Sequence, residues 1–189
     1  MRGDRSLSPD NGRQARRLPV SRESAPLIVS ALLGAEDFAW LDALRRAHFP
    51  ADRNRLPAHL TLFHHLPPSL LPELKRRLGE AIRAAPPRAE AAGLIDLGGG
   101  VAVRIVSPEL EDIRADLAES FLGALTPQDQ AGWRPHVTIQ NKVAPTEARG
   151  LKRRLEVDFR PRPLRIDGLA VSGYRDGLWE PLSRHTFRG

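Results

Sequence analysis

Two stretches of the sequence carry the same pattern: AHLTLFHHL at residues 58–66 and PHVTIQNKV at residues 135–143. Each places a His-x-Thr pair inside an apolar run that has the length and residue types of a strand. Successive side chains of a strand point to opposite faces, so each strand is expected to have one apolar face. The other face is expected to carry His59, Thr61, Phe63 and His65 in the first stretch and His136, Thr138, Gln140 and Lys142 in the second.

These stretches belong to a longer internal repeat. An ungapped shift of the sequence by 77 residues gives 15 identities over the 56 pairs that run from Leu27 to Ile82. The identities include both His-x-Thr pairs and the run LKRRL, which occurs at residues 74–78 and again at 151–155. Two separate runs on one offset indicate an internal duplication. Each half is expected to follow the order strand, helix, strand, helix, strand.

The chain from Pro26 onward alternates short apolar runs with amphipathic stretches, which is typical of a mixed α and β domain. The expected strands are Leu27–Leu33, His59–Leu66, Ala91–Leu97, Val101–Val106, His136–Val143, Leu164–Val171 and Leu178–Phe187. The expected helices are Glu36–His48, Ser69–Ala84, Pro108–Leu125 and Thr146–Val157. The sequence thus predicts an α+β fold of two halves about a pseudo-twofold axis, with largely antiparallel sheets lining a central cleft and helices outside.

The chain length of 189 residues suits one folded domain. Residues 1–25 are rich in arginine and serine and lack periodicity, so a flexible basic tail is expected there. The domain is expected at residues 26–189, with repeats at about 26–98 and 99–175 and a C-terminal hairpin strand. Asp176-Gly177 suits the tight turn of that hairpin, because both residues accept positive backbone angles.

Composition excludes several classes of protein. The chain has no cysteine, which excludes a disulfide scaffold, a thiolate zinc site and a cysteine nucleophile. Residues 1–24 hold +3 of the net charge of +6, so the rest is mildly basic, as suits a phosphate-bearing substrate. No apolar run approaches the ~18 residues that a membrane span needs, and the N-terminus lacks the apolar core of a secretory signal. We therefore expect a cytoplasmic monomer with no membrane partner.

Two imidazoles and two hydroxyls on facing strands suit phosphoryl chemistry. Histidine has an unperturbed pKa near ~6.5, so at neutral pH one ring accepts a proton while a second donates one. Such a pair flanking a phosphorus atom supports in-line displacement without a metal or other cofactor. Each threonine hydroxyl can donate to a phosphate oxygen on which negative charge accumulates.

The motifs His59-Leu60-Thr61-Leu62 and His136-Val137-Thr138-Ile139 resemble those of the 2H phosphoesterase superfamily, which includes 2′-5′ RNA ligase-like proteins and 2′,3′-cyclic phosphodiesterases. The resemblance covers about residues 26–187. It implies that His59 and His136 are general acid and base on a 2′,3′-cyclic phosphate or a related 2′-linked phosphodiester, and that Thr61 and Thr138 bind the phosphate. It also implies an RNA end or a small nucleotide as substrate, and 2′-5′ ligation as the reverse reaction.

Some ligase-like members carry an arginine soon after each motif, where this chain has Phe63 and Asn141. Phe63 is predicted to stack on a base, and His65, Gln140 and Lys142 are the other predicted substrate contacts. His64, on the apolar face, is predicted to be a structural or partly exposed ring. A metal-dependent hydrolase using His59, His65 and His136 is disfavoured, because no Asp or Glu lies near either motif on the same face. The remaining alternative is a noncatalytic nucleotide- or RNA-binding module of the same fold.

Overall fold

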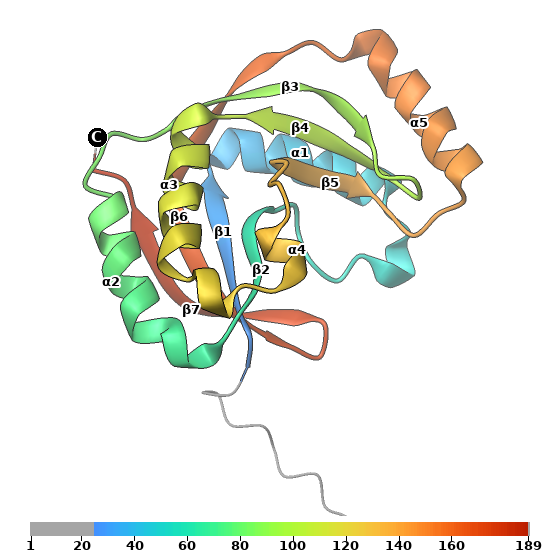
Figure 1. Ribbon diagram of the computed structural model, residues 1–189. Coiled ribbons are helices and arrows are strands. Elements are labelled where there is room, and N and C mark those ends of the chain that lie inside the picture. The colour runs from blue at the N-terminus through green and yellow to red at the C-terminus, as the bar shows by residue number, and fades with distance from the viewer. Residues whose placement is uncertain (1–24, 189) are drawn as a thin grey trace, which may run out of the picture.

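The computed structural model describes residues 25–188, so nearly all of the predicted tail lies outside the described residues. Figure 1 shows the strands gathered at the centre of the described domain and the helices around them. In chain order the elements are β1 (Leu27–Leu33), α1 (Ala35–His48), a 3-10 turn (Ala51–Arg53), β2 (Leu60–Leu66), a 3-10 turn (Pro68–Leu70), α2 (Leu71–Ala81), β3 (Arg88–Asp96), β4 (Val101–Val106), α3 (Pro108–Ser120), a 3-10 turn (Leu122–Ala124), α4 (Pro127–Gln130), β5 (His136–Gln140), α5 (Pro145–Asp158), β6 (Arg162–Arg175) and β7 (Leu178–Thr186).

Every predicted strand and helix is present, and the largest shift of a single end is at the C-terminus of α3. Ser107 caps its start, since its hydroxyl accepts a hydrogen bond of 3.3 Å from the N–H of Leu110. The helix was expected to reach Leu125 but ends at Ser120. Gly123 weakens a helix, and Pro127 favours an extended backbone at Thr126, where ψ is 159°. The chain therefore leaves α3 early and forms the short helix α4.

The strands form one antiparallel sheet that closes on itself. Its order is β1-β2-β5-β4-β3-β6-β7, and β1 also pairs with β6. β6 is long enough for three partners: residues 162–165 pair with β3, residues 166–173 pair with β1, and residues 168–175 pair with β7. The shortest strand pairing is between β2 and β5, which share the single residue pair Leu60 and Val137. The predicted α+β fold with an antiparallel sheet and outer helices is confirmed, and the sheet is barrel-like.

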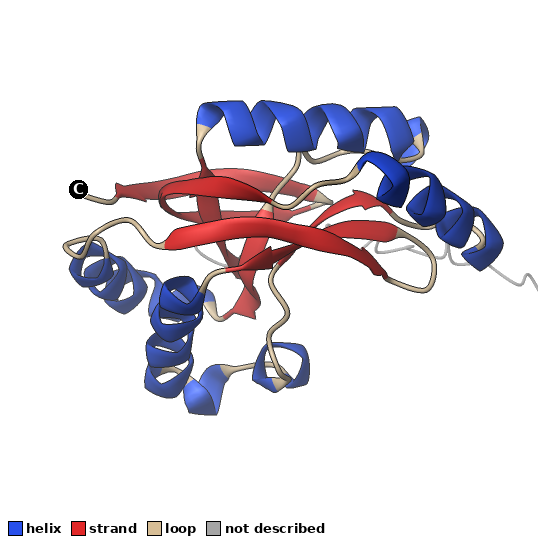
Figure 2. Ribbon diagram, turned by 90° about the horizontal axis from the view of Figure 1, so that it is seen from above, coloured by secondary structure: helices blue, strands red, loops and turns tan. Residues whose placement is uncertain are grey.

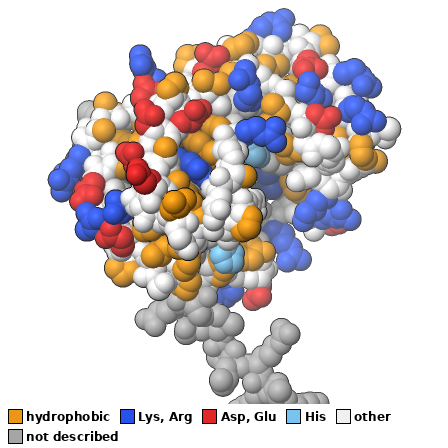
Figure 3. All heavy atoms as spheres, viewed as in Figure 1, with side chains coloured by type: hydrophobic (Ala, Val, Ile, Leu, Met, Phe, Trp, Pro, Cys, Tyr) orange, Lys and Arg blue, Asp and Glu red, His pale blue; other side chains and the backbone are white. Residues whose placement is uncertain are grey.

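Helices cover the sheet on opposite sides, as Figure 2 shows. α1 and α5 lie on one side, and α2, α3 and α4 lie on the other. In the view of Figure 3, Lys and Arg side chains are interspersed with Asp and Glu over much of the surface. That distribution agrees with the mild net charge expected for the folded part of the chain.

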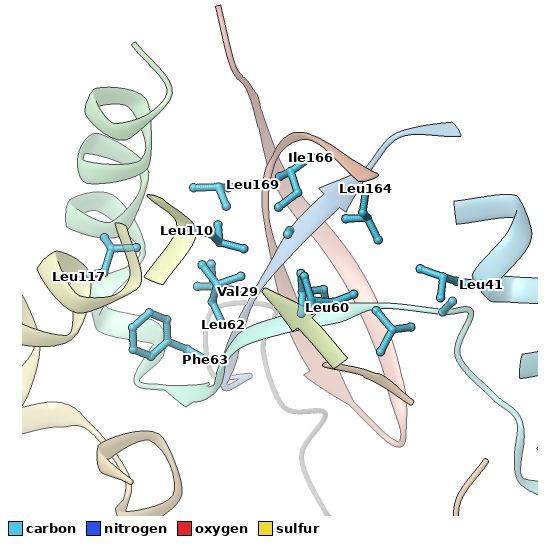
Figure 4. Packing of buried hydrophobic residues seen from close by; sticks show 14 of the residues in the cluster. Val29, Leu41, Leu60, Leu62, Phe63, Leu110, Leu117, Leu164, Ile166 and Leu169 are labelled. Atoms are coloured by element: carbon cyan, nitrogen blue, oxygen red, sulfur yellow. The ribbon is translucent and has the colours of Figure 1, made fainter. Parts of the chain in front are cut away.

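The core fills the space between the sheet and the helices. Figure 4 shows Leu60, Leu62 and Val29 at its centre, with Leu117 of α3 on one side and Leu41 of α1 on the other. Each of the central three is fully buried. Val137 and Ile139 of β5 are fully buried as well. Burial of such side chains contributes about 1.5–3 kcal/mol each, so the two strands that carry the His-x-Thr motifs are firmly anchored.

The two halves of the domain repeat the same order of elements. β1, α1, β2, α2 and β3 form the first half, and β4, α3, β5, α5 and β6 form the second, which adds α4 between α3 and β5. The agreement supports the internal duplication proposed from the sequence. In the closed sheet, β2 and β5, the motif strands, lie side by side.

Candidate active site

The single pair between β2 and β5 brings the two motifs together. Leu60 and Val137 face each other across the strands and are fully buried. Their neighbours in sequence point to the opposite face of the sheet. The antiparallel register sets His59 beside Thr138 and Thr61 beside His136. All four line one cavity of about 260 Å³, called here the histidine cavity.

Both motif histidines are held in the same way by the backbone. Nδ1 of His59 lies 2.8 Å from the carbonyl oxygen of Pro57, and Nδ1 of His136 lies 2.7 Å from that of Arg134. A carbonyl oxygen can only accept a hydrogen bond, so Nδ1 carries a proton in each ring. Nε2 is then the atom that can gain or lose a proton. Each imidazole is thereby prepared to act as a base when neutral and as an acid when protonated.

A side chain of α1 holds the loop before β2 in place. Asp42 of α1 accepts a hydrogen bond of 2.9 Å from the N–H of Ala58, and this carboxylate is buried. The ring of Trp179, from β7, lies 4.5 Å from that of His59 between centroids. These contacts hold the His59 ring in place and remove water from one side of it.

The pKa of His59 is lowered to about 4, chiefly by burial and also by the positive charges of Arg45, His64 and His136, while the hydrogen bond to Pro57 opposes this shift. The ring is therefore neutral at physiological pH. Its Nε2 then has a free lone pair, which is the state that a general base requires.

Acidification is expected to destabilise the protein through His59. The unfolded ring has a pKa near ~6.5 and the folded ring one of about 4, so below pH 6.5 the unfolded state binds more protons. The stability from a neutral His59 is complete above that value and is lost as the pH falls toward 4. After a discount for partial exposure, wild type should lose about 1–2 kcal/mol more than His59→Gln between about pH 7 and about pH 5. Denaturant unfolding at both pH values measures this, and equal losses would contradict the buried neutral ring.

Each motif threonine has its carbonyl oxygen fixed by a side chain of the other half. The indole Nε1 of Trp133 donates to the carbonyl oxygen of Thr61 at 2.9 Å. Nη1 of Arg45 donates to that of Thr138 at 2.7 Å. Arg45 is buried and also donates from Nε to the side chain of Asn54 and the carbonyl oxygen of Leu56. These bonds tie the loops before both motifs to the facing strand.

Bulges change the faces predicted for the residues after each motif. β2 has extra residues relative to β1 between the pairs Thr61/Ser30 and Leu66/Leu27, and β5 has one relative to β4 between Thr138 and Gln140. A bulge interrupts strict alternation. At the second of these, β4 comes so close that a Cβ on Gly100 would lie 2.1 Å from the Gln140 carbonyl oxygen.

As a result, three predicted substrate contacts lie outside the site. Phe63 is fully buried in the core and Gln140 is 4% exposed, so the predicted substrate contacts of both are wrong. His65 is exposed but does not line the histidine cavity or the second cavity described below. His64 and Asn141, which come directly after Phe63 and Gln140 in the sequence, line the cavities instead. The prediction that His64 belongs to the apolar face is wrong for the same reason.

A second cavity of about 600 Å³, called here the basic cavity, adjoins the first and shares His59 and Thr138 with it. Lys142 lines it, and its contact with a substrate stays a prediction. Four basic side chains, two aromatic ones and one acidic one surround it: Arg45, Arg53, Arg55, Lys142, Phe49, Tyr174 and Asp52. This composition suits a ligand with negative charge and a flat ring.

The sequence profile of the 2′-5′ RNA ligase superfamily matches residues 34–178, which is most of the chain. The chain belongs to the 2′-5′ RNA ligase superfamily. The resemblance to 2H phosphoesterases found in the sequence is thereby confirmed. No curated protein sequence matches this superfamily member significantly.

Solved structures share the fold of this 2′-5′ RNA ligase superfamily member. TT0787 of Thermus thermophilus has a TM-score of 0.59 and 19% identity, and the alignment covers 87% of this chain and 98% of that one. LigT of E. coli with 3′-AMP has a TM-score of 0.59 and 17% identity, with 88% and 99% covered. LigT with NADP+ has a TM-score of 0.57 and 18% identity, with 87% and 98% covered.

Several residues near the site of this superfamily member escaped the sequence reasoning. Arg45 and Arg114 belong to amphipathic helices, where arginine is common, so no local signal marks them. Trp179 lay in a predicted hairpin, but its contact with His59 depends on how β7 joins the sheet. Trp133 lines the histidine cavity, and its indole donates a hydrogen bond to the carbonyl oxygen of Thr61.

The described residues of this superfamily member contain no group of three His, Cys, Asp or Glu side chains arranged to hold a metal ion. In particular, His65 does not join His59 and His136 in the histidine cavity. No helix within residues 25–188 is both long and apolar enough to cross a membrane.

Proposed function

We propose that this protein is a phosphoesterase that hydrolyses a 2′,3′-cyclic phosphate, or a related 2′-linked phosphodiester, of RNA or of a nucleotide without a metal. The main observation in support is that two imidazoles and two threonines line one cavity. Each imidazole is hydrogen-bonded through Nδ1 to a backbone carbonyl oxygen. Family membership supports phosphoester chemistry. The complexes of E. coli LigT with 3′-AMP and NADP+ support a nucleotide as the class of ligand.

In the proposed mechanism, His59 is the base and His136 the acid. Nε2 of His59 takes a proton from a water molecule as the water oxygen forms a bond to phosphorus. The bond from phosphorus to one ribose oxygen breaks, and Nε2–H of His136 gives its proton to that oxygen. Thr61 and Thr138 donate from their hydroxyls to the nonbridging oxygens, on which charge builds up. The product is a phosphomonoester, and attack by a ribose hydroxyl on the cyclic phosphate in place of water gives 2′-5′ ligation.

All four proposed catalytic and phosphate-binding residues come from one chain, which supports a monomeric enzyme. The basic cavity beside them is proposed to take the base and any further phosphates of the substrate, with Lys142 among its charged contacts. The cavity's shared lining by His59 and Thr138 supports this, because such a ligand would lie next to the reacting phosphate.

A substrate screen tests this function. The purified chain is incubated, with and without EDTA, with 2′,3′-cyclic mononucleotides, with an oligonucleotide ending in a cyclic phosphate, and with 2′-5′-linked dinucleotides. Turnover of at least one class that survives EDTA is expected. Loss of all turnover in EDTA would contradict the metal-free reaction. Tight nucleotide binding with no turnover of any class would favour the noncatalytic binding module.

A further inference from the structure

His64 occupies an unusual position in the histidine cavity. The bulge in β2 turns its side chain out of the core, leaving it 43% exposed among the residues that line the cavity. Its Nδ1 lies 3.1 Å from Oδ1 of Asp129, a residue of α4. A carboxylate oxygen accepts, so Nδ1 carries the proton and Nε2 is the other hydrogen-bonding atom of the ring. A third imidazole therefore shares the cavity with the two of the motifs.

Asp129 is a buried carboxylate whose oxygens are fully used. Its side chain is 1% exposed. Besides the ring of His64, it accepts the backbone N–H groups of His64 at 2.9 Å and His65 at 3.0 Å, and the hydroxyl of Thr126 lies 3.3 Å away. Burial alone would raise the pKa of Asp129, but the hydrogen bonds from His64 and His65 outweigh it and hold that pKa below its ordinary value. The carboxylate is ionised and faces the imidazole of His64.

Other charged and titratable groups face this pair from each neighbouring element. Arg114 of α3 donates to the backbone carbonyl oxygen of Asp129, and burial lowers the pKa of its guanidinium. His59, His136 and Arg134 line the same cavity. Of these groups, only Asp129 carries negative charge, and its side chain contacts His64 alone among the rings. An ionised carboxylate stabilises positive charge on the imidazole that donates to it, whereas the neutral carbonyl groups behind His59 and His136 do so less.

The other half of the domain does not build this pair. On the 77-residue offset, the counterparts of His64 and Asp129 are Asn141 and Asp52. Asp52 has a side chain that is 77% exposed and pairs with Arg53 at 3.5 Å, while the Asn141 side chain accepts the N–H of Lys142. The fold therefore forms this strand and loop without a carboxylate–imidazole pair. The pair is a property of the histidine cavity and not a general requirement of the fold.

We propose that His64, held as an imidazolium by Asp129, is a third phosphate-binding residue of the histidine cavity and donates from Nε2–H to a phosphate oxygen. The proposal deepens the proposed function, since it concerns the same cavity and the same phosphate. It makes the cavity asymmetric: a neutral imidazole at His59 lies near a cationic one at His64, so binding of the anion and abstraction of a proton are assigned to different rings. The positive charge of His64 also favours the neutral form of His59.

Sulfate binding tests the proposal without relying on turnover. Sulfate keeps its double charge across the pH range in which histidine titrates, whereas phosphate has a second pKa of about 6, so only the protein changes with pH in this experiment. The full chain is titrated with sulfate at about pH 5.5 and about pH 8, with the ring resonances of the histidines followed by NMR. The variants are His64→Gln, His64→Lys and, as the matched neighbour outside the cavity, His65→Gln.

Wild type and His65→Gln should bind sulfate several-fold more tightly at the lower pH, with the His64 ring among the shifted resonances. His64→Gln should lose about three- to tenfold in affinity at the lower pH and show a clearly smaller pH dependence than wild type. His64→Lys, charged at both pH values, should recover the affinity and likewise show a smaller pH dependence than wild type. Unchanged pH dependence in either His64 variant would overturn the proposal. That result would leave the roles of His59 and His136 intact, just as loss of turnover would leave sulfate binding intact.

Discussion

Replacement of either His59 or His136 by alanine is expected to lower kcat about 10²- to 10⁴-fold on a 2′,3′-cyclic phosphate, because each ring supplies one of the two proton transfers. The kcat of the double variant should fall far less than the product of the two single losses, because the two rings act as a unit and loss of either one removes most of the catalysis. Steady-state kinetics at neutral pH measure all three variants.

His65→Ala is the matched control for these variants. It removes an imidazole six residues after His59 that is exposed and lines neither cavity. Its kcat should stay close to that of wild type. Near-normal turnover in either single motif variant, or an equal loss in the control, would show that the reaction does not depend on the two cavity imidazoles.

Thr61→Val and Thr138→Val should each lower kcat by up to about 10²- to 10³-fold, the loss typical of one missing oxyanion donor. Valine keeps the branched shape that suits a strand and removes only the hydroxyl. Thr186, an exposed residue of β7, provides the matched Thr→Val control and should leave kcat unchanged. The pH dependence should keep its shape in both variants, because a hydroxyl does not titrate in this range. Full activity in Thr61→Val or Thr138→Val would remove that threonine from the phosphate site.

Much of the fold could be predicted from local patterns. The strands at Leu27–Leu33 and Val101–Val106 were predicted with the bounds that they have, because β-branched and aliphatic runs between turn residues are a strong signal. Closure of the sheet could not be predicted in this way. It depends on β6 pairing with β1, β3 and β7 along different parts of its length. Periodicity identifies a strand but does not name its partners.

For the candidate site as well, local patterns predicted some residues and could not predict others. His59, Thr61, His136 and Thr138 flank a pair of core residues, so simple alternation put them on one face of each strand and the repeat put the two strands about one pseudo-twofold axis. Beyond the motifs, alternation failed, because bulges add two residues to β2 and one to β5 and so change which side chains face the cavities. Phe63 and Gln140 thereby enter the core, and His64 enters the cavity. Asp129 stabilises the first bulge from a distant segment, a contact that no local pattern shows.

The pH profile of kcat/KM for wild type on a 2′,3′-cyclic mononucleotide tests the two-imidazole account most directly. One ring must be neutral and the other protonated, so the profile from about pH 3 to about pH 9 should be bell-shaped. The acidic limb should fall near pH 4, where His59 gains its proton, and the alkaline limb should follow loss of the proton from the acid. Both limbs describe the coupled pair of rings. A profile with a single limb, or one independent of pH, would contradict acid–base catalysis by His59 and His136.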